Sequence, residues 1–110
     1  EGETIMIPIS KLPCPVEIQA KTTGYDDIGM PVETWETVAI IQADIQPMGG
    51  ELAERQYGIV ETGITSRMFC NPTDAVQLAR RVVHDGKIYE IRYVAPYRGH
   101  MEVLLRPEVV

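Results

Sequence analysis

The side chains that most often do chemistry in small proteins, cysteine and histidine, are few in this chain and far apart. Its two cysteines, Cys14 and Cys70, are too few for a disulfide framework. Together with His84 and His100 they give four nominal zinc ligands, but they lack the short paired spacing of zinc sites. We therefore expect no metal and no cofactor, and leave open whether the two cysteines interact.

Acidic residues and glycines form the other candidate groups. Asp26 and Asp27 are adjacent in a turn, but the further oxygen ligands of a calcium loop are missing, so we interpret them as a solvated turn. Gly49-Gly50 lacks the lysine and the strand-to-helix context of a phosphate-binding loop. There is no nucleophile elbow, and both histidines fall at expected hairpin turns. The sequence predicts no catalytic residue and no enzymatic activity.

Length and composition favour one globular domain. The chain has 110 residues, of which 45% are hydrophobic and 24% charged, which is ordinary for a folded protein. Its apolar runs are only a few residues long, so we expect no membrane-spanning segment. The net charge of −6 argues against a protein that holds DNA through its phosphates.

The charge is unevenly distributed along the chain. Residues 1–61 hold eleven acids against three bases, whereas residues 62–110 hold five acids against seven bases. This asymmetry favours two faces of opposite sign, suited to head-to-tail contacts between copies. Chance clustering of solvated charges explains it equally well.

Alternation of apolar and polar residues predicts an all-β, mainly antiparallel fold of six or so short strands. The clearest signal is a hairpin over residues 82–91, whose two-residue turn is Asp85-Gly86. Its outgoing strand has Tyr89, Ile91 and Tyr93 on one face. The other expected strands are residues 16–21, 32–46, 62–70 and 101–105. Strands joined by hairpins in this way are typical of a small barrel or sandwich.

Three further segments stand apart from the strands. Residues 1–15 read as an extended, proline-rich arm that precedes a single domain over residues 16–110. Residues 51–57 have the composition of a two-turn helix ended by Gly58, which is too short to be stable alone and must dock or stay mobile. Residues 75–81 also look helical by propensity. Trp35, the single tryptophan, either packs between strands or anchors an interface.

Taken in order, these pieces form a recognisable pattern. A Trp-containing strand ends in Ala-Asp-Ile-Gln-Pro at residues 43–47, and a Gly-Gly-Glu-Leu-Ala insertion follows. Later come Arg67, the hairpin strand at Arg81-Val82, and His-Met-Glu at residues 100–102 leading into Val-Leu-Leu. Over residues 15–106 the sequence resembles the head–tail adaptor or head-closure (stopper) proteins of long-tailed phages and gene-transfer particles.

The resemblance implies a small β-barrel that assembles as a ring of, usually, twelve copies at the neck of the virion, after assembly in the host cytoplasm. Such a ring lies below the portal and its adaptor ring, and tail terminator or tail tube proteins dock beneath it. Double-stranded DNA passes through its channel without sequence-specific binding, and no membrane is involved. The alternatives are a tail-completion or tail-terminator ring of the same particle, or a monomeric barrel that binds a peptide or ligand.

The resemblance also implies that the insertion over residues 46–62 faces the channel and can close it, and an acidic lining there would repel DNA phosphates. The expected channel-facing residues are Gln46, Met48, Gly49, Gly50, Glu51, Glu54, Arg55, Tyr57 and Glu61. For the acids, simple helix-start electrostatics is the competing interpretation. The expected subunit and partner interface comprises Ile5, Ile7, Trp35, Tyr97 and Arg98.

Overall fold

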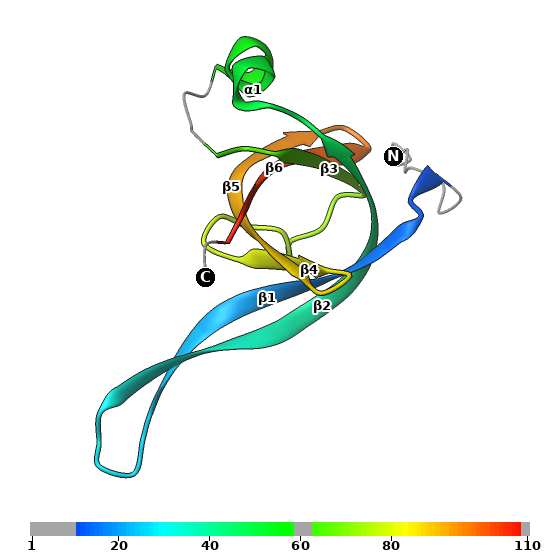
Figure 1. Cartoon of the computed structure of the whole chain (residues 1–110). Coiled ribbons are helices and arrows are strands. Elements are labelled where there is room, and N and C mark those ends of the chain that lie inside the picture. Colours follow the sequence, from blue (N-terminus) through cyan, green and yellow to red (C-terminus); the bar gives the residue numbers. More distant parts are fainter. Residues whose placement is uncertain (1–10, 59–62, 109–110) are drawn as a thin grey trace.

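The chain folds as a closed antiparallel barrel of six strands with one short helix (Figure 1). The computed structural model describes residues 11–58 and 63–108. The strands are hydrogen-bonded in the order β1-β2-β3-β6-β5-β4, and the closed order confirms the predicted all-β class. Their bounds are β1 (Cys14–Tyr25), β2 (Pro31–Pro47), β3 (Ser66–Cys70), β4 (Arg81–His84), β5 (Lys87–Tyr97) and β6 (His100–Pro107), with α1 (Gly50–Tyr57) between β2 and β3.

The barrel interior is filled by alternate residues of its strands. In β3, Ser66, Met68 and Cys70 are buried, as the alternation predicts, while the residues between them are half-buried. Side chains from all six strands meet them in one apolar cluster. The fully buried members of that cluster include Val16, Ile18, Ala43, Val82, Val103 and Leu105. The core therefore follows directly from the period-two pattern.

The predicted β4–β5 hairpin is confirmed. Its turn residues Asp85 and Gly86 have φ of 52° and 78°, as a two-residue primed turn requires. His84 pairs with Lys87 on either side of the turn, so the register matches the sequence pattern.

The first strand, β1, is much longer than predicted, whereas β2 extends the prediction by only one residue at each end. Beyond the barrel they pair only with each other, from Ala20 opposite Glu36 to Tyr25 opposite Pro31. The neighbouring pairings cover only Glu17–Gln19 of β1 and Ala43–Pro47 of β2. Residues 20–36 therefore form a two-stranded ribbon, here called the hairpin arm, which projects from the barrel (Figure 1).

Residues 75–81, which look helical by propensity, form no helix. The segment consists of turns, and its last residue, Arg81, opens β4. Ala79 has a φ of 71°, which is incompatible with an α-helix. Val76 is buried in the barrel core and Arg80 Nη1 donates to the carbonyl oxygen of Ala75 at 2.8 Å. Tertiary packing thus overrides local helix propensity here.

A β-bulge in β5 places Tyr93 on the opposite face from the one that the sequence pattern predicts. The register with β6 shifts between Ile91, opposite Leu105, and Tyr93, opposite Leu104. Tyr89 and Ile91 contact the barrel core, but the extra residue turns Tyr93 to the outer face. The prediction that all three share one face was therefore wrong for Tyr93.

Among the described residues, no helix is long and apolar enough to cross a membrane.

Replacing Met68 by alanine tests the barrel core. Met68 is fully buried in the central cluster, so Met68→Ala should lower the free energy of unfolding by about 2–5 kcal/mol in denaturant titrations. Ile40→Ala, at an exposed position of β2, is the matched control and should change it by less than about 0.5 kcal/mol. Equal effects of the two substitutions would contradict this assignment of the core.

Candidate functional site

The insertion between β2 and β3 contains α1, and a glycine at each end of the helix explains where it begins and ends. Gly49 precedes the helix in an extended conformation. Gly58 ends it with a φ of 71°, a left-handed conformation that favours glycine, and donates its N–H to the carbonyl oxygen of Glu54 at 2.9 Å. The helix predicted over residues 51–57 is therefore confirmed, with one further residue at its start.

The helix docks on the outside of the barrel. Ala53, on the inner face of the helix, is fully buried against Met48, Ile64 and Leu104. Leu104 lies between two interior residues of β6, so its side chain points to the opposite, outer face. Tyr93 packs against the same cluster. This second cluster is separate from the barrel core, and it supplies the burial that an eight-residue helix needs.

A polar network fastens the end of α1 to the barrel. Tyr57 Oη donates a hydrogen bond to Glu102 Oε1 of β6. Arg67 Nη1 of β3 donates to Tyr57 Oη at 3.3 Å and to Gln56 Oε1 at 2.9 Å. His100 Nε2 lies 3.0 Å from the other oxygen of Glu102. The helix terminus is thus held by two side chains from adjacent strands, Glu102 and Arg67, and His100 in turn contacts Glu102.

This network shifts two pKa values. Burial raises the pKa of Glu102, but hydrogen bonds from Tyr57 and His100, and the charges of His100 and Arg67, outweigh it and hold the pKa below its usual range. Burial and the hydrogen bond to Glu102 raise the pKa of Tyr57. At neutral pH the pair is therefore a phenol donating to a carboxylate, a charge-assisted hydrogen bond.

The predicted insertion residues divide between surface and interior. Glu51, Glu54 and Arg55 are exposed on the outer side of α1, where Glu51 and Arg55 approach only to 3.9 Å. Met48 is buried in the second cluster, beneath the helix. Gln46 donates to Asp44 at 2.9 Å. Glu61 lies outside the described residues.

The predicted interface residues lie at separate places. Trp35 is on the hairpin arm, where the Arg81 guanidinium carbon is 4.2 Å and Lys21 Nζ 5.6 Å from its ring centroid. Tyr97 stacks on the His100 ring at 4.9 Å and is half exposed, at the opposite end of β5 from the β4–β5 turn. Arg98 is exposed in the following turn. Ile5 and Ile7 lie outside the described residues.

A basic cleft at the base of the hairpin arm was not predicted. Its volume is about 330 Å³, and five cations line it: Lys21, Arg80, Arg81, Arg92 and Arg106. Only Glu90 and Glu108 oppose them within the lining. The one sequence signal was the excess of bases after residue 61, because residues from β1, β4, β5, β6 and a turn meet here only in the folded barrel.

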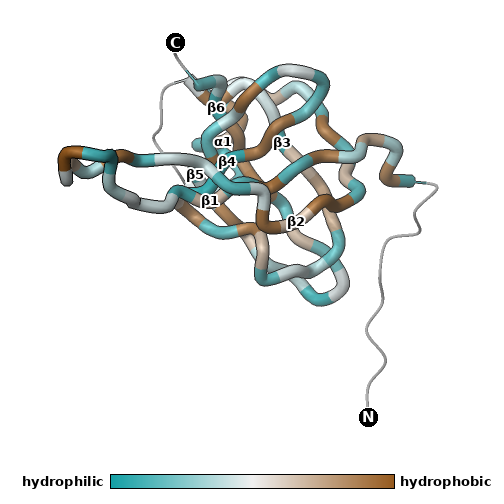
Figure 2. The backbone as a smooth tube through the Cα atoms, turned by 90° about the horizontal axis from the view of Figure 1, so that it is seen from below, coloured by the Kyte–Doolittle hydropathy of each residue, from teal (hydrophilic) through white to brown (hydrophobic). Residues whose placement is uncertain are grey.

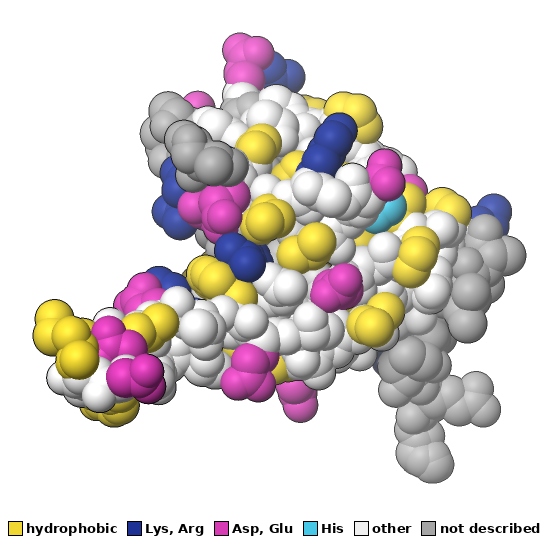
Figure 3. Space-filling model, turned by 60° about the horizontal axis from the view of Figure 1, so that its bottom comes forward, with side chains coloured by type: hydrophobic (Ala, Val, Ile, Leu, Met, Phe, Trp, Pro, Cys, Tyr) yellow, Lys and Arg dark blue, Asp and Glu magenta, His cyan; other side chains and the backbone are white. Residues whose placement is uncertain are grey.

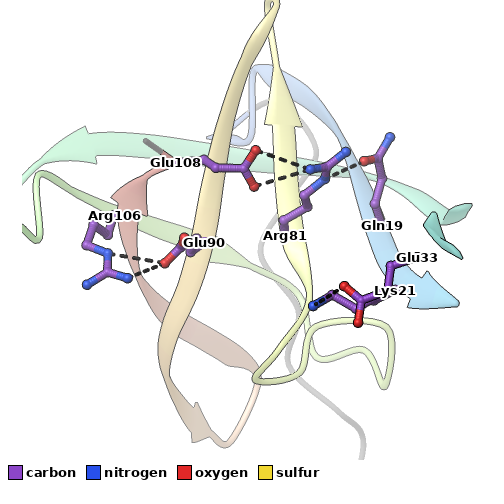
Figure 4. A network of polar contacts seen from close by, with 7 residues as sticks. All are labelled: Gln19, Lys21, Glu33, Arg81, Glu90, Arg106 and Glu108. Atoms are coloured by element: carbon purple, nitrogen blue, oxygen red, sulfur yellow. Dashed lines mark hydrogen bonds and ion pairs between the residues drawn. The ribbon is translucent and has the colours of Figure 1, made fainter. Parts of the chain in front are cut away.

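Ion pairs order this cleft (Figure 4). Arg81 Nη1 lies 3.2 Å from Glu108, and Arg81 Nε donates to Gln19 Oε1 at 2.7 Å. Arg106 pairs with Glu90. Lys21 Nζ lies 3.3 Å from Glu33 of the arm. Because three carboxylates are shared among five cations, the cleft retains net positive charge.

The cysteines stay apart. Cys14 and Cys70 pair with Ala43 from opposite sides, so two strand spacings, roughly 10 Å, separate their backbones. That separation is too large for a disulfide, and both are free thiols. Burial raises the pKa of Cys70 to about 11. Within residues 11–58 and 63–108, no cluster of three His, Cys, Asp or Glu side chains is placed to hold a metal.

Comparison with known proteins gives a family and a fold. The sequence profile of a family described as phage head completion protein matches residues 7–106. The solution structure of protein SF1141 from Shigella flexneri 2a is similar, with a TM-score of 0.74 at 20% identity, covering 94% of this chain and 98% of that one. A chain from the virion of a native gene transfer agent particle has a TM-score of 0.56 at 17% identity, covering 87% and 94%. No curated protein sequence matches the chain.

Replacing Glu102 by glutamine tests the polar network through its pH dependence. Because the folded-state pKa of Glu102 lies below its unfolded-state value, its carboxylate stabilises the fold above the unfolded-state pKa of about 4.3, and this contribution is lost as pH falls through the folded-state pKa. Glu102→Gln should therefore cost about 1–2 kcal/mol at pH 7 and progressively less as the pH falls below 4.3 in denaturant titrations.

The exposed substitution Glu51→Gln is the control and should leave the stability curve nearly unchanged. Parallel curves for the wild-type chain and Glu102→Gln across this pH range would contradict the assigned role of the network.

Proposed function

Because the chain belongs to the phage head completion protein family, we propose that it forms a head-closure ring at the head–tail junction, below the portal and its adaptor. Family membership makes it a structural component of the phage virion. The finer proposal is that the barrel supplies the ring wall, that tail proteins dock on its lower face, and that the insertion between β2 and β3 gates the DNA channel.

The observation that carries the proposal is the separate docking of α1. The helix buries Ala53 in its own cluster on the outer face of β5 and β6, while the barrel core is complete without it. A movement of the insertion breaks the second cluster and the polar contacts of Tyr57 but leaves the barrel closed. Elements of low local stability on a rigid support are those that move in conformational switches.

The charge of α1 supports a position beside DNA. Its outer surface exposes Glu51 and Glu54 against Arg55. In a ring this pattern repeats with every copy, and the resulting negative lining repels phosphates, so that DNA passes without sticking.

The closed barrel also limits how copies can join. Where each strand is paired on both sides, neighbouring copies cannot join by extending the sheet; outside the hairpin arm, residues 37–42 of β2 pair only with β1. Contacts between copies therefore use side chains on the barrel surface and on projecting parts. We assign these to the hairpin arm and to residues 1–15, with Ile5, Ile7 and Trp35 toward a neighbour or the adaptor, and Tyr97 and Arg98 toward a partner ring.

Cryo-electron microscopy of particles that contain this chain, reconstructed at the head–tail junction, tests the proposal. A ring of these barrels below the adaptor, with α1 beside the channel, is the expected result. A ring at the upper end of the tail would instead favour a tail-completion protein. Absence of the chain from the particle would overturn both and favour a soluble binding module.

Stiffening the start of α1 tests the gate. Gly49 has a φ of −79° and Gly50 is the first helical residue, two positions that accept proline. Gly49→Pro/Gly50→Pro should therefore fold with at most small loss or gain of stability but impair DNA retention or ejection, because the insertion can no longer swing at its start. Packaged DNA and infectivity are the measurements.

The double variant Gly49→Ala/Gly50→Ala retains both N–H groups and serves as the control. Normal DNA content and normal infectivity in particles of the proline variant would contradict the proposal that the insertion gates the DNA channel.

A further inference from the structure

The end of the hairpin arm exposes a concentrated set of apolar side chains. Tyr25 is 74% exposed, Ile28 82% and Met30 56%. Figure 2 shows this hydrophobic stretch at the far end of the arm, and Figure 3 shows hydrophobic and acidic side chains together there. Isolated exposed apolar residues are ordinary, but a group at the end of a projection indicates a contact surface.

The tip is ordered by its own hydrogen bonds. Asp26 Oδ1 accepts from the backbone N–H of Ile28 at 3.0 Å and of Met30 at 2.8 Å. Farther back, the hydroxyls of Thr22 and Thr34 are 2.8 Å apart across the two strands. Because the tip is already in one conformation, docking it costs little ordering entropy.

The arm is also acidic. Residues 20–36 contain four acids, Asp26, Asp27, Glu33 and Glu36, against the single cation Lys21. Asp27 is exposed at the tip itself, beside Ile28. Whatever receives the tip must therefore offer both apolar surface and positive charge.

The basic cleft at the base of the arm offers both. Its five cations outnumber its two carboxylates, and the Trp35 ring forms part of its wall. The aliphatic stems of its arginines add further apolar surface. Figure 3 shows basic side chains where the arm meets the barrel, on the same face as the tip.

The tip cannot enter the cleft of its own chain. Lys21 and Trp35, which line the cleft, lie opposite each other at the base of the arm, and the paired strands continue from there to Tyr25 and Pro31. At about 3.3 Å a residue, this places the tip roughly 15–20 Å from its own cleft along a paired ribbon. The cleft of a second copy, with its excess of positive charge, complements the tip.

We propose that the arm tip of each copy seats in the basic cleft of the next copy, with Asp27 facing the excess positive charge. Tip and cleft are different surfaces, so the contact is head-to-tail and propagates in one direction until a ring closes. The proposal rests on the ring assigned above and names the contact that holds it together. The opposite charges of the two halves of the chain then serve assembly.

Cysteine cross-linking tests the contact. In a Cys14→Ser background, the double variant Ile28→Cys/Arg92→Cys places one thiol at the tip and one in the cleft, while Cys70 is buried and unreactive. On mild oxidation it should give a ladder of covalent multimers on non-reducing gels, both as purified protein and in isolated particles. An isologous pairing would stop at dimers.

The matched control is Ile40→Cys/Arg92→Cys, because Ile40 is 70% exposed on β2 but lies outside the tip. The tip variant should exceed it about tenfold in multimer yield, since docking raises the local thiol concentration. Adding Asp27→Lys, or salt near 1 M where the screening length is about 3 Å, should reduce the yield of the tip variant toward the control.

Equal yields from tip and control in both preparations would overturn the proposal. It is also overturned if the cleft instead binds a short DNA duplex that Arg92→Cys weakens, while the tip gives no ladder. If microscopy shows a ring at the head–tail junction but cross-linking gives no multimers, only the proposed tip–cleft contact is rejected. If cross-linking gives multimers but no ring is found at the junction, the tip–cleft contact is supported and the proposed function is rejected.

Discussion

Closure of the sheet is the constraint on which the rest of this molecule depends. Once β4 pairs with β1, every barrel strand has two neighbours, and the interior is filled by alternate apolar residues such as Ile18, Met68 and Val82. A closed barrel is rigid and has no free edge over that region. Contacts with other molecules are therefore assigned to side-chain surfaces, namely the basic cleft on the barrel and the parts attached to it: α1, the hairpin arm and the ends of the chain.

The two attached elements that the structure describes are held differently. Helix α1 rests on its own apolar cluster and on the charge-assisted bond between Tyr57 and Glu102, so it can detach without disturbing the barrel core. The hairpin arm is stiffened by its strand pairing and by the turn that Asp26 organises, and its strands continue directly from β1 and β2 of the barrel. The first arrangement suits a part that changes position, and the second suits a fixed contact.

Charge connects these features. The acids gather on the arm and on the outer side of α1, while the bases converge on the cleft at the base of the arm. The bases of the cleft are ordered by contacts with the protein. Arg81, for example, is half-buried, stacks on Trp35, donates a hydrogen bond to Gln19 and forms an ion pair with Glu108. A chain whose two oppositely charged surfaces lie at the two ends of one stiff ribbon is suited to head-to-tail assembly.

Local patterns determined the strands, the Asp85-Gly86 turn, the helix ended by Gly58 and the inward residues of β3, because period, turn chemistry and capping act over a few residues. Tertiary structure alone decided the outward turn of Tyr93, the loss of helix over residues 75–81, the length of the arm and the basic cleft. The bulge at Arg92 depends on the register with β6, and burial of Val76 on the closed barrel. The cleft joins Lys21 to Arg106 across almost the whole chain. Its five cations are scattered in sequence, and only barrel closure brings them together.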